Sequence, residues 1–472
     1  MSPPQAEILI CGAGIAGISA AYHLAVRRGI DGVVLVDEAP PLTVTSDKST
    51  ECYRNWWPGP GEAMVRLMSR SIDLTEELAL TSGNAFALNR NGYAYFTARP
   101  ETARAFEEQG REISRLGAGP LRVVRGEASD PELPPVSWSE RASEEELRHR
   151  EPGVTDGADL VLDPGWIRQR FPFLADDVMA MLRPRRCGWL SAQQLGMWLL
   201  ERARERGVRE VRGRVTAVDT TGGRVRSVDV ATPGGTERWE VTHFVNAAGP
   251  GLAQVGELLG IDLPVVNELH AKATFTDSLQ VLPRELPLMV WNDPIRLSWS
   301  AEELALLEED RDLSWLREEL PGGLHFRPEG GHGSQAVLGL WAYHTDTIDP
   351  PRFPPAIDPL YAQVVLEGMV RMVPAMAPYK ERVREPWVDG GYYCKTRENR
   401  PLIGPLPVEG AWVLGALSGY GIMASQGAAE ILTAQLTGET PPPWADAFLL
   451  ERYEDPGYRK MLEDWDAGAG EL

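Results

Sequence analysis

A glycine-rich turn between two apolar strands, close to the start of the chain, constrains the fold more than any other feature. Residues 7–11 read Glu-Ile-Leu-Ile-Cys, residues 12–17 read Gly-Ala-Gly-Ile-Ala-Gly, and residues 33–37 read Val-Val-Leu-Val-Asp. Apolar runs of this length predict buried strands, and the segment between them predicts a helix that begins at the turn. Strand, turn, helix and strand in this order indicate a dinucleotide-binding unit.

Each residue type in this unit has a physical role. Gly12 allows a tight turn, Gly14 allows the backbone to approach a pyrophosphate, and Gly17 allows the helix to pack on the strand. The diphosphate then binds free N–H groups at the helix N-terminus. Asp37 follows Gly17 by twenty residues, where a carboxylate accepts hydrogen bonds from ribose hydroxyls and disfavours a 2′-phosphate. The unit therefore fits FAD or NAD better than NADP.

Length and composition limit the remaining classes of protein. The chain has 472 residues, 43% hydrophobic and 24% charged, which predicts a soluble globular protein of two domains or one elaborated α/β domain. We find no run of eighteen apolar residues and no room for a signal peptide before residue 7, so we expect no membrane anchor and a cytoplasmic location. The net charge of −21 argues against nucleic acid as a partner.

Cysteine spacing gives no indication of a metal site. The four cysteines lie far apart in the sequence and form no C-x-x-C pair, so we expect reduced thiols and no bound metal. They are Cys11, Cys52, Cys187 and Cys394.

The rest of the chain alternates helical and strand patterns. The expected elements are a helix over residues 62–80, a hairpin over 86–96 with its turn at 89–92, a charged segment without evident chemistry over 100–185, a helix over 193–206, several strands over 208–241, an acidic helical insertion over 301–319 and a strand-turn-helix unit over 401–437.

Four separated segments together resemble one family. They are residues 11–17 with Asp37, residues 45–50 (Thr-Ser-Asp-Lys-Ser-Thr), residues 245–251 (Val-Asn-Ala-Ala-Gly-Pro-Gly), and residues 400–405 with 417–423 (Arg-Pro-Leu-Ile-Gly-Pro and Leu-Ser-Gly-Tyr-Gly-Ile-Met). In this order, and over nearly the whole chain, they resemble the D-amino-acid-oxidase-like family of FAD-dependent amine oxidases and dehydrogenases. This family includes the glycine oxidase, sarcosine oxidase and dimethylglycine dehydrogenase types.

The resemblance implies a fold of the α/β plus α+β class. A Rossmann-like FAD-binding domain is then built from discontinuous segments, and a second, mainly antiparallel sheet covers the flavin. The expected boundaries are residues 1–85, 186–258 and 388–440 for the FAD-binding domain, residues 86–185 and 259–387 for the substrate domain, and residues 441–472 for a C-terminal tail.

The resemblance implies FAD as the cofactor, held without a covalent bond, although Cys394 lies near the position where some relatives attach it. Hydride transfer puts negative charge on the N1–C2=O edge of a flavin, so free N–H groups at the start of the last helix are expected there. The residues expected to bind FAD are Gly12, Gly14, Ile15, Ala16, Gly17, Asp37, Glu38, Thr45, Ser46, Ser49, Thr50, Ala248, Gly249, Gly415, Ser418, Gly419, Tyr420, Gly421, Ile422 and Met423.

The expected catalytic face departs from the family pattern. Residues 339–345 resemble the segment of sarcosine oxidases that places a lysine, and four residues later a histidine, above the flavin. His344 matches the histidine and is a candidate catalytic residue, whereas Leu340 occupies the lysine position. Because a cation near the flavin stabilises superoxide during reoxidation by O₂, this leucine puts fast oxidase activity in doubt. Lys272 is the first candidate to supply the cation instead. Further candidates are Lys48, Lys395 and His270.

Two further residues are candidates for substrate contact. Arg54, followed by Trp56 and Trp57, lies where relatives place arginines that pair with a substrate carboxylate in a fork; a solvated arginine is the alternative. Tyr393, next to Tyr392, could hold a carboxylate or form one wall of an amine cage; a core tyrosine is the alternative.

The expected activity is FAD-dependent oxidation of a C–N bond in a small secondary amine or amino acid, which gives an imine that water hydrolyses. O₂ or another electron acceptor would reoxidise the flavin, and the oligomeric state stays open. One alternative keeps the fold and oxidises a 2-hydroxy acid or a related alcohol. A second alternative is a flavin-binding assembly factor without catalysis, and a third is an NAD-dependent dehydrogenase.

Overall fold

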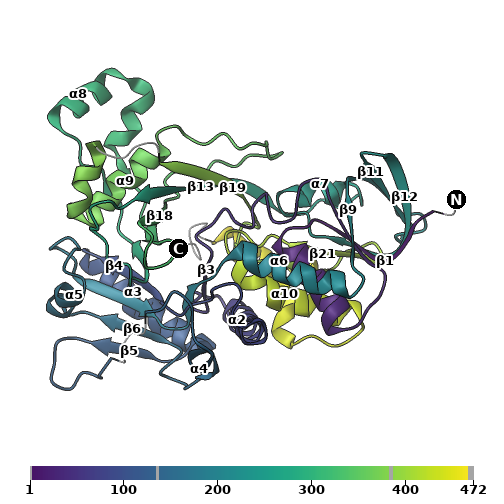
Figure 1. The fold of residues 1–472 in the computed structure, drawn as a ribbon, viewed down its shortest axis with the longest axis horizontal. Coiled ribbons are helices and arrows are strands. Elements are labelled where there is room, and N and C mark those ends of the chain that lie inside the picture. The colour runs from purple at the N-terminus through teal and green to yellow at the C-terminus, as the bar shows by residue number, and fades with distance from the viewer. Residues whose placement is uncertain (1–2, 134–137, 382–385, 466–472) are drawn as a thin grey trace.

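A computed structural model describes residues 3–133, 138–381 and 386–465. Two large sheets organise the described residues, and each sheet takes strands from segments far apart in the sequence. The purple N-terminal and yellow C-terminal segments lie side by side in one half of the molecule, and the second sheet lies in the other half (Figure 1). The mixed, discontinuous fold expected from the sequence is confirmed.

The first sheet has eight strands among the described residues, and β1 lies parallel between β2 and β12. The last strand, β21, adds in parallel to the other side of β12. The strands are β1 (Gln5–Cys11), β2 (Val33–Asp37), β9 (Arg209–Arg212), β10 (Arg214–Asp219), β11 (Ser227–Thr232), β12 (Gly235–Asn246), β20 (Leu402–Pro405) and β21 (Ala411–Gly415). Parallel strands are covered on both faces, which explains the apolar runs in β1 and β2.

Four helices pack together against one face of this sheet. They are α1 (Ile15–Tyr22), α2 (Ala63–Ser82), α6 (Ala192–Glu205) and α10 (Gly421–Leu436). Helix α1 lies against both α6 and α10, and α10 also lies against α2. The N-termini of α1 and α10 follow β1 and β21, so both begin at the carboxyl ends of parallel strands.

The second sheet has nine strands in the described part of the chain, in the order β19-β13-β18-β17-β14-β4-β7-β6-β5. They are β4 (Tyr93–Thr97), β5 (Leu121–Val124), β6 (Ala158–Val161), β7 (Ala180–Pro184), β13 (Val266–Thr276), β14 (Leu288–Trp291), β17 (Leu324–Pro328), β18 (Ala336–Leu340) and β19 (Trp387–Lys395). Most neighbours are antiparallel, with β14–β4 and β5–β6 as parallel pairs. Strand β19 belongs to this sheet, although the expected boundary at residue 388 places most of it with the first.

The two faces of the second sheet pack against different partners. Alternate residues such as Phe96 and Trp291 face a core that contains α9 (Tyr361–Met372). The residues between them, such as Tyr95 and Val290, belong to the same core as α1 and α10. We call this second side the inner face, because it is turned toward the first sheet and its helices.

The remaining elements are short and connect or flank the two sheets. They are β3 (Cys52–Arg54), which pairs with β8 (Cys187–Trp189), β15 (Ile295–Arg296), which pairs with β16 (Glu319–Leu320), and the helices α3 (Pro100–Ile113), α4 (Glu144–Arg148), α5 (Pro164–Arg170), α7 (Leu252–Glu257), α8 (Ala301–Glu309) and α11 (Pro456–Glu463).

Several expected elements are present and one is wrong. The helices over residues 62–80 and 193–206 are α2 and α6, and the acidic insertion begins with α8. The hairpin over residues 86–96 does not form, because residues 87–90 have no regular secondary structure and β4 pairs with β7 and β14. The Asn84 side chain accepts a hydrogen bond from the Leu88 N–H and donates one to the Leu88 carbonyl, so this backbone is satisfied without a partner strand.

Candidate active site

A cavity of about 770 Å³ lies at the carboxyl ends of β1, β2 and β21. Its lining comes from both ends and the middle of the chain. Sixteen of the twenty residues expected to bind the cofactor line it: Gly12, Gly14, Ile15, Ala16, Asp37, Glu38, Thr45, Ser46, Ser49, Ala248, Gly249, Gly415, Ser418, Gly419, Gly421 and Ile422. The other four, Gly17, Thr50, Tyr420 and Met423, lie behind this lining as buried neighbours. A crevice at the ends of parallel strands is where open α/β sheets bind ligands.

The turn after β1 is built from close contacts that a side chain would block. Gly12 has φ +117°, and a Cβ there would lie 2.2 Å from the carbonyl oxygen of Ala247. A Cβ on Gly17 would lie 1.9 Å from the carbonyl oxygen of Gly12, so the first turn of α1 packs directly on the loop. These contacts bring the N-terminus of α1 to the cavity, where a helix end favours an anion, and the Ile15 N–H donates to Ser46 Oγ (2.9 Å).

Asp37 at the end of β2 holds this turn in place. Its carboxylate accepts hydrogen bonds from the backbone N–H groups of Ala13 (2.7 Å) and Ala39 (2.8 Å). Burial raises the pKa of Asp37 more than these bonds lower it. A carboxylate has about four lone-pair positions, so Asp37 retains acceptor capacity toward the cavity. Glu38 is exposed and forms an ion pair with Arg214 (2.7 Å).

The N-terminus of α10 forms the opposite part of the lining. Ser418 has φ +47° and its N–H donates to the Cys394 carbonyl (2.9 Å), which turns the chain sharply into the helix. A Cβ on Gly419 would lie 2.4 Å from the Tyr393 ring, so the ring and the loop are in contact. Tyr420 is buried and its hydroxyl donates to the Asn399 carbonyl (2.9 Å). A helix of 16 residues thus directs its positive end at the cavity.

These features fit FAD. The α1 N-terminus and the close-packed turn suit a diphosphate, and Asp37 suits a ribose hydroxyl. The α10 N-terminus suits a flavin edge that becomes negative on reduction. Cys394 also lines the cavity, and burial raises the pKa of its thiol to about 12.

The inner face of the second sheet contacts the loop of residues 45–50. Lys272 on β13 donates from Nζ to the backbone carbonyls of Asp47 and Ser49 (3.2 Å to Ser49). Arg327 on β17 donates from Nε to the carbonyl of Thr50 (2.9 Å). Burial lowers the pKa of Lys272. Both cations therefore hold the loop that carries Thr45, Ser46 and Ser49 into the cavity.

The structure places Lys272 beside the position of the missing lysine. In the register of β13 and β18, Lys272 lies directly opposite Leu340. The other two candidate lysines form ion pairs: Lys48 with Asp389 (2.8 Å) and Lys395 with Glu268 (2.8 Å).

The structure does not bring His344 to the cavity. The side chain is exposed and lies against Trp315, with ring centroids 4.4 Å apart. Residues four apart share a face only while a strand continues, and β18 ends at Leu340. The expected pairing of positions 340 and 344 above the flavin is therefore lost in this fold.

Arg54 is a buried cation without an acidic partner among the described residues. It is 4% exposed, and its Nε donates to the Trp56 carbonyl (3.1 Å). The guanidinium lies over the rings of Trp57 (4.6 Å to the centroid) and Tyr93 (5.7 Å). A buried guanidinium is costly unless a carboxylate or similar anion pairs with it. Arg54 is not among the residues that line the cavity.

Tyr393 is joined to a histidine network on the inner face. Its ring stacks on His270 with centroids 4.1 Å apart, and His270 Nε2 lies 3.4 Å from a carboxylate oxygen of Glu268. Burial raises the pKa of Glu268, but the hydrogen bonds from His270 and Lys395 lower it overall.

Sequence reasoning missed His325, which lies on the same inner face in β17 and is 3% exposed. The signal for it was the alternation in Leu-His-Phe-Arg-Pro, residues 324–328, which places His325 and Arg327 on one side of a buried strand.

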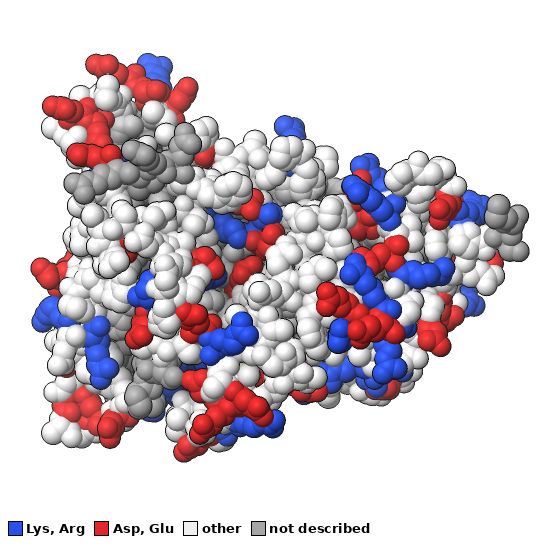
Figure 2. All heavy atoms as spheres, viewed as in Figure 1, with Lys and Arg blue, Asp and Glu red and all other residues white. Residues whose placement is uncertain are grey.

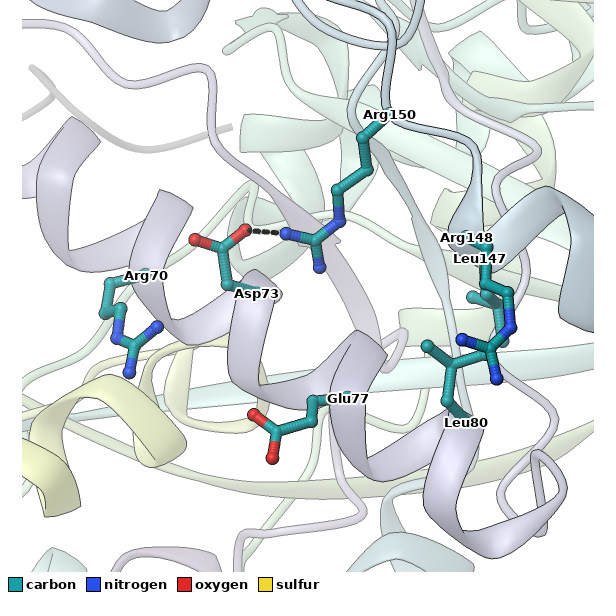
Figure 3. A pocket seen from close by; sticks show the side chains of 7 residues that line it. All are labelled: Arg70, Asp73, Glu77, Leu80, Leu147, Arg148 and Arg150. Atoms are coloured by element: carbon teal, nitrogen blue, oxygen red, sulfur yellow. Dashed lines mark hydrogen bonds and ion pairs between the residues drawn. The ribbon is translucent and has the colours of Figure 1, made fainter.

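A second hollow, of about 440 Å³, lies between α2 and the α4 region (Figure 3). Its arginines are paired with acids: Arg70 with Glu430 (2.6 Å), Arg148 with Glu144 (2.8 Å) and Arg150 with Asp73 (2.9 Å). Its charges are thus already compensated.

Acidic and basic side chains alternate over the face drawn in Figure 2, and acidic ones gather over α8. Among the described residues, no helix is long and apolar enough to span a bilayer, and no three His, Cys, Asp or Glu residues are grouped as metal ligands would be.

Comparisons with known proteins agree with this geometry. The sequence model of a family described as FAD dependent oxidoreductase matches residues 7–435. Mitochondrial dimethylglycine dehydrogenase from Rattus norvegicus is 25% identical over 456 residues, which is 93% of this chain and 44% of that protein. The Homo sapiens enzyme is 25% identical over 446 residues, 93% of this chain and 43% of its own length. The chain thus spans less than half the length of these relatives.

Solved structures show the same fold at low identity. L-proline dehydrogenase from P. horikoshii superposes with a TM-score of 0.69 at 16% identity, covering 96% of this chain and 98% of that one. Glycine oxidase from Geobacillus kaustophilus gives a TM-score of 0.69 at 15% identity, covering 95% and 98%.

Proposed function

The chain belongs to the family of FAD-dependent oxidoreductases, and on this basis we propose that it oxidises the C–N bond of a small amino acid or secondary amine to an imine. The observation that carries the proposal is the buried Arg54 side chain, whose guanidinium lies over Trp57 and is paired with no acid in the described residues. A substrate carboxylate would neutralise it through a forked pair of hydrogen bonds. The relatives named above act on dimethylglycine, glycine or L-proline, all of which carry such a carboxylate.

The chain's own residues would hold the cofactor as follows. The turn at Gly12 and Gly14 and the N-terminus of α1 would bind the diphosphate, and Asp37 would bind a ribose hydroxyl. The N-terminus of α10 would stabilise negative charge on the reduced ring. Bound FAD would supply the acceptor for a hydride, which is two electrons and one proton.

The substrate nitrogen would have to be in its neutral, deprotonated form when the C–N bond is oxidised. An ammonium group must lose a proton before hydride can leave the adjacent carbon, because the nitrogen lone pair forms the new C=N bond. Burial beside the cationic Arg54 lowers an amine pKa, since both effects disfavour a second positive charge. The proton leaves to solvent, and water then adds to the imine carbon to release a carbonyl compound and an amine.

A substrate screen tests the proposal. Holoenzyme is mixed anaerobically with glycine, N-methylglycine, proline, lactate and other 2-hydroxy acids, and loss of flavin absorbance is followed. Bleaching by amino acids is the expected result. Bleaching by hydroxy acids alone would establish the alcohol-oxidising alternative, and no bleaching at all, with FAD bound, would favour an assembly factor.

We expect the flavin to be released when the protein is precipitated with acid. The Cys394 thiol, whose pKa burial raises to about 12, stays protonated at neutral pH and is a poor nucleophile toward the ring. The measurement is the absorbance of the supernatant and pellet, with Cys394→Ser as the control. A yellow pellet for the native protein and a colourless one for Cys394→Ser would instead identify a thioether at this residue.

The Leu340→Lys variant is expected to be reoxidised by O₂ at least tenfold faster than the native protein, because it adds a cation where superoxide would form. Leu340 is 5% exposed and opposite Lys272. The measurement is stopped-flow reoxidation of dithionite-reduced holoenzyme, which needs no substrate, with Leu340→Met as the neutral control. Equal rates in both variants, with FAD retained, would show that position 340 does not face the reacting edge.

A further inference from the structure

His325 has a buried nitrogen that nothing in the described structure satisfies. Its Nδ1 lies 2.9 Å from the Gly323 carbonyl, and a carbonyl oxygen can only accept, so Nδ1 carries the proton. Nε2 is then a lone-pair acceptor, and it has no hydrogen-bond partner among the described residues. Burial lowers the pKa of His325 to about 4, which keeps the ring neutral. A buried unpaired acceptor costs about 1–3 kcal/mol, so it calls for an explanation.

His325 lies on the inner face, among residues that contact the cavity wall. In β17 it is two residues before Arg327, and in the sheet it lies opposite Leu340, which in turn lies opposite Lys272. Arg327 and Lys272 donate to the carbonyls of residues 47–50, next to Ser46 and Ser49 of the cavity lining. His325 therefore lies on the same face of the sheet as these two cations, behind the loop that lines the cavity and not in the lining itself.

The charged neighbours of His325 are those of the proposed substrate site. The charges that act on its ring come from Arg54 and His270. His270 stacks on Tyr393, which lines the cavity, and Arg54 is the cation proposed to hold a carboxylate. A neutral acceptor and an unpaired cation thus lie in one buried region. Together they match a ligand that has a carboxylate and a hydrogen-bond donor.

We propose that Nε2 of His325 accepts the N–H of the bound substrate amine, and that the substrate is therefore a primary or secondary amino acid rather than a tertiary one. This inference rests on the proposed function. The reacting amine must be neutral, and a neutral primary or secondary amine still has an N–H, whereas a neutral tertiary amine has none. A tertiary amine would leave Nε2 buried and unpaired, which selects against it.

Two inert acids isolate this hydrogen bond from catalysis. Pyrrole-2-carboxylate and furan-2-carboxylate have nearly the same shape and the same carboxylate, but the ring N–H of the first is an oxygen in the second. Their dissociation constants are measured by calorimetry on the holoenzyme. We expect the pyrrole acid to bind about 10- to 100-fold more tightly to the native protein.

Variants at two positions separate the roles. His325→Phe should bind both acids with equal affinity, while His325→Gln, which keeps an acceptor, should retain part of the preference. Arg54→Met should weaken both acids by the same factor and leave their ratio unchanged. FAD content and melting temperature are compared for each variant to confirm that it is folded.

Binding and flavin-bleaching measurements on the native protein are enough to test the inference. Equal binding of the two acids, or flavin bleaching by N,N-dimethylglycine as fast as by N-methylglycine, would overturn it, while bleaching by amino acids would leave the proposed function intact. Bleaching by hydroxy acids alone would instead remove the proposed function, whatever the ratio of the two acids. A preference for the pyrrole acid that persists in His325→Phe would also overturn the assignment to His325.

Discussion

Replacement of Arg54 by methionine is expected to lower kcat/KM for an amino acid by about 30- to 5,000-fold, from about 2–5 kcal/mol for loss of a buried charged pair. Arg54 is 4% exposed, its guanidinium lies over Trp57, and no acid pairs with it in the described residues. Methionine keeps the length and apolar stem of the side chain but leaves the incoming carboxylate unpaired. The measurement is steady-state kinetics or anaerobic flavin reduction with N-methylglycine.

A matched substrate distinguishes lost recognition from damaged structure. N-methylethylamine has the reacting nitrogen of N-methylglycine but no carboxylate, so Arg54→Met should affect it little. Arg54→Lys, which keeps the charge but loses the fork, should fall between methionine and the native residue. If the variant lost equal activity toward both substrates, Arg54 would instead have a structural role in packing over the aromatic rings of Trp57 and Tyr93.

Replacement of Gly12 by alanine is expected to remove most of the bound FAD and to lower the melting temperature. Two energetic costs add. Alanine rarely adopts a positive φ, which costs about 1–3 kcal/mol. Its Cβ would also lie 2.2 Å from the backbone oxygen of Ala247, and relieving this overlap costs about 1–3 kcal/mol or more. The Ala247 N–H donates to the Cys11 carbonyl at 2.9 Å, so the two segments cannot easily separate. The combined cost corresponds to an affinity loss of at least about 30-fold.

Gly333→Ala is the control for this prediction. Gly333 is exposed, its φ is outside the left-handed region, and no atom lies within 4 Å of the added Cβ. FAD content per chain and thermal unfolding are measured for both variants. Full FAD content in Gly12→Ala would mean that the turn can shift away from Ala247 without disturbing the cavity.

The cofactor cavity was the part of the site most accessible from sequence. Its lining segments each have a local signature, such as the glycine turn at residues 12–17 and the Ser-Gly-Tyr-Gly start of α10, and local signatures do not depend on distant pairing. The hairpin at 86–96 failed for the opposite reason. There the Asn84 side chain and backbone groups of Ala142, Trp189 and Ser191 satisfy the backbone in place of a partner strand, and composition does not reveal that.

The catalytic side depends on long-range strand pairing, which the sequence does not display. Nothing in the residues around Leu340 shows that Lys272, 68 residues earlier, lies directly opposite it. The alternation that would carry His344 to the same face as Leu340 stops because the strand ends. The alternation in residues 324–328 indicates that His325 and Arg327 share a face, but only the pairing of β17 with β18 shows that His325 lies opposite Leu340.

The arrangement of the first sheet has a consequence for synthesis of the protein. Strands β1, β12 and β21 are neighbours in space but leave the ribosome at widely separated times, because they come from residues 5–11, 235–246 and 411–415. At a translation rate of about 5–20 residues per second, the glycine turn is synthesised about 20–80 s before the last strand and helix α10. During that interval the nascent chain exposes an unpaired strand edge. Free FAD should therefore stabilise the chain only once β21 and α10 have been synthesised, and chaperones that shield the edge should raise the yield of holoenzyme more than added flavin does.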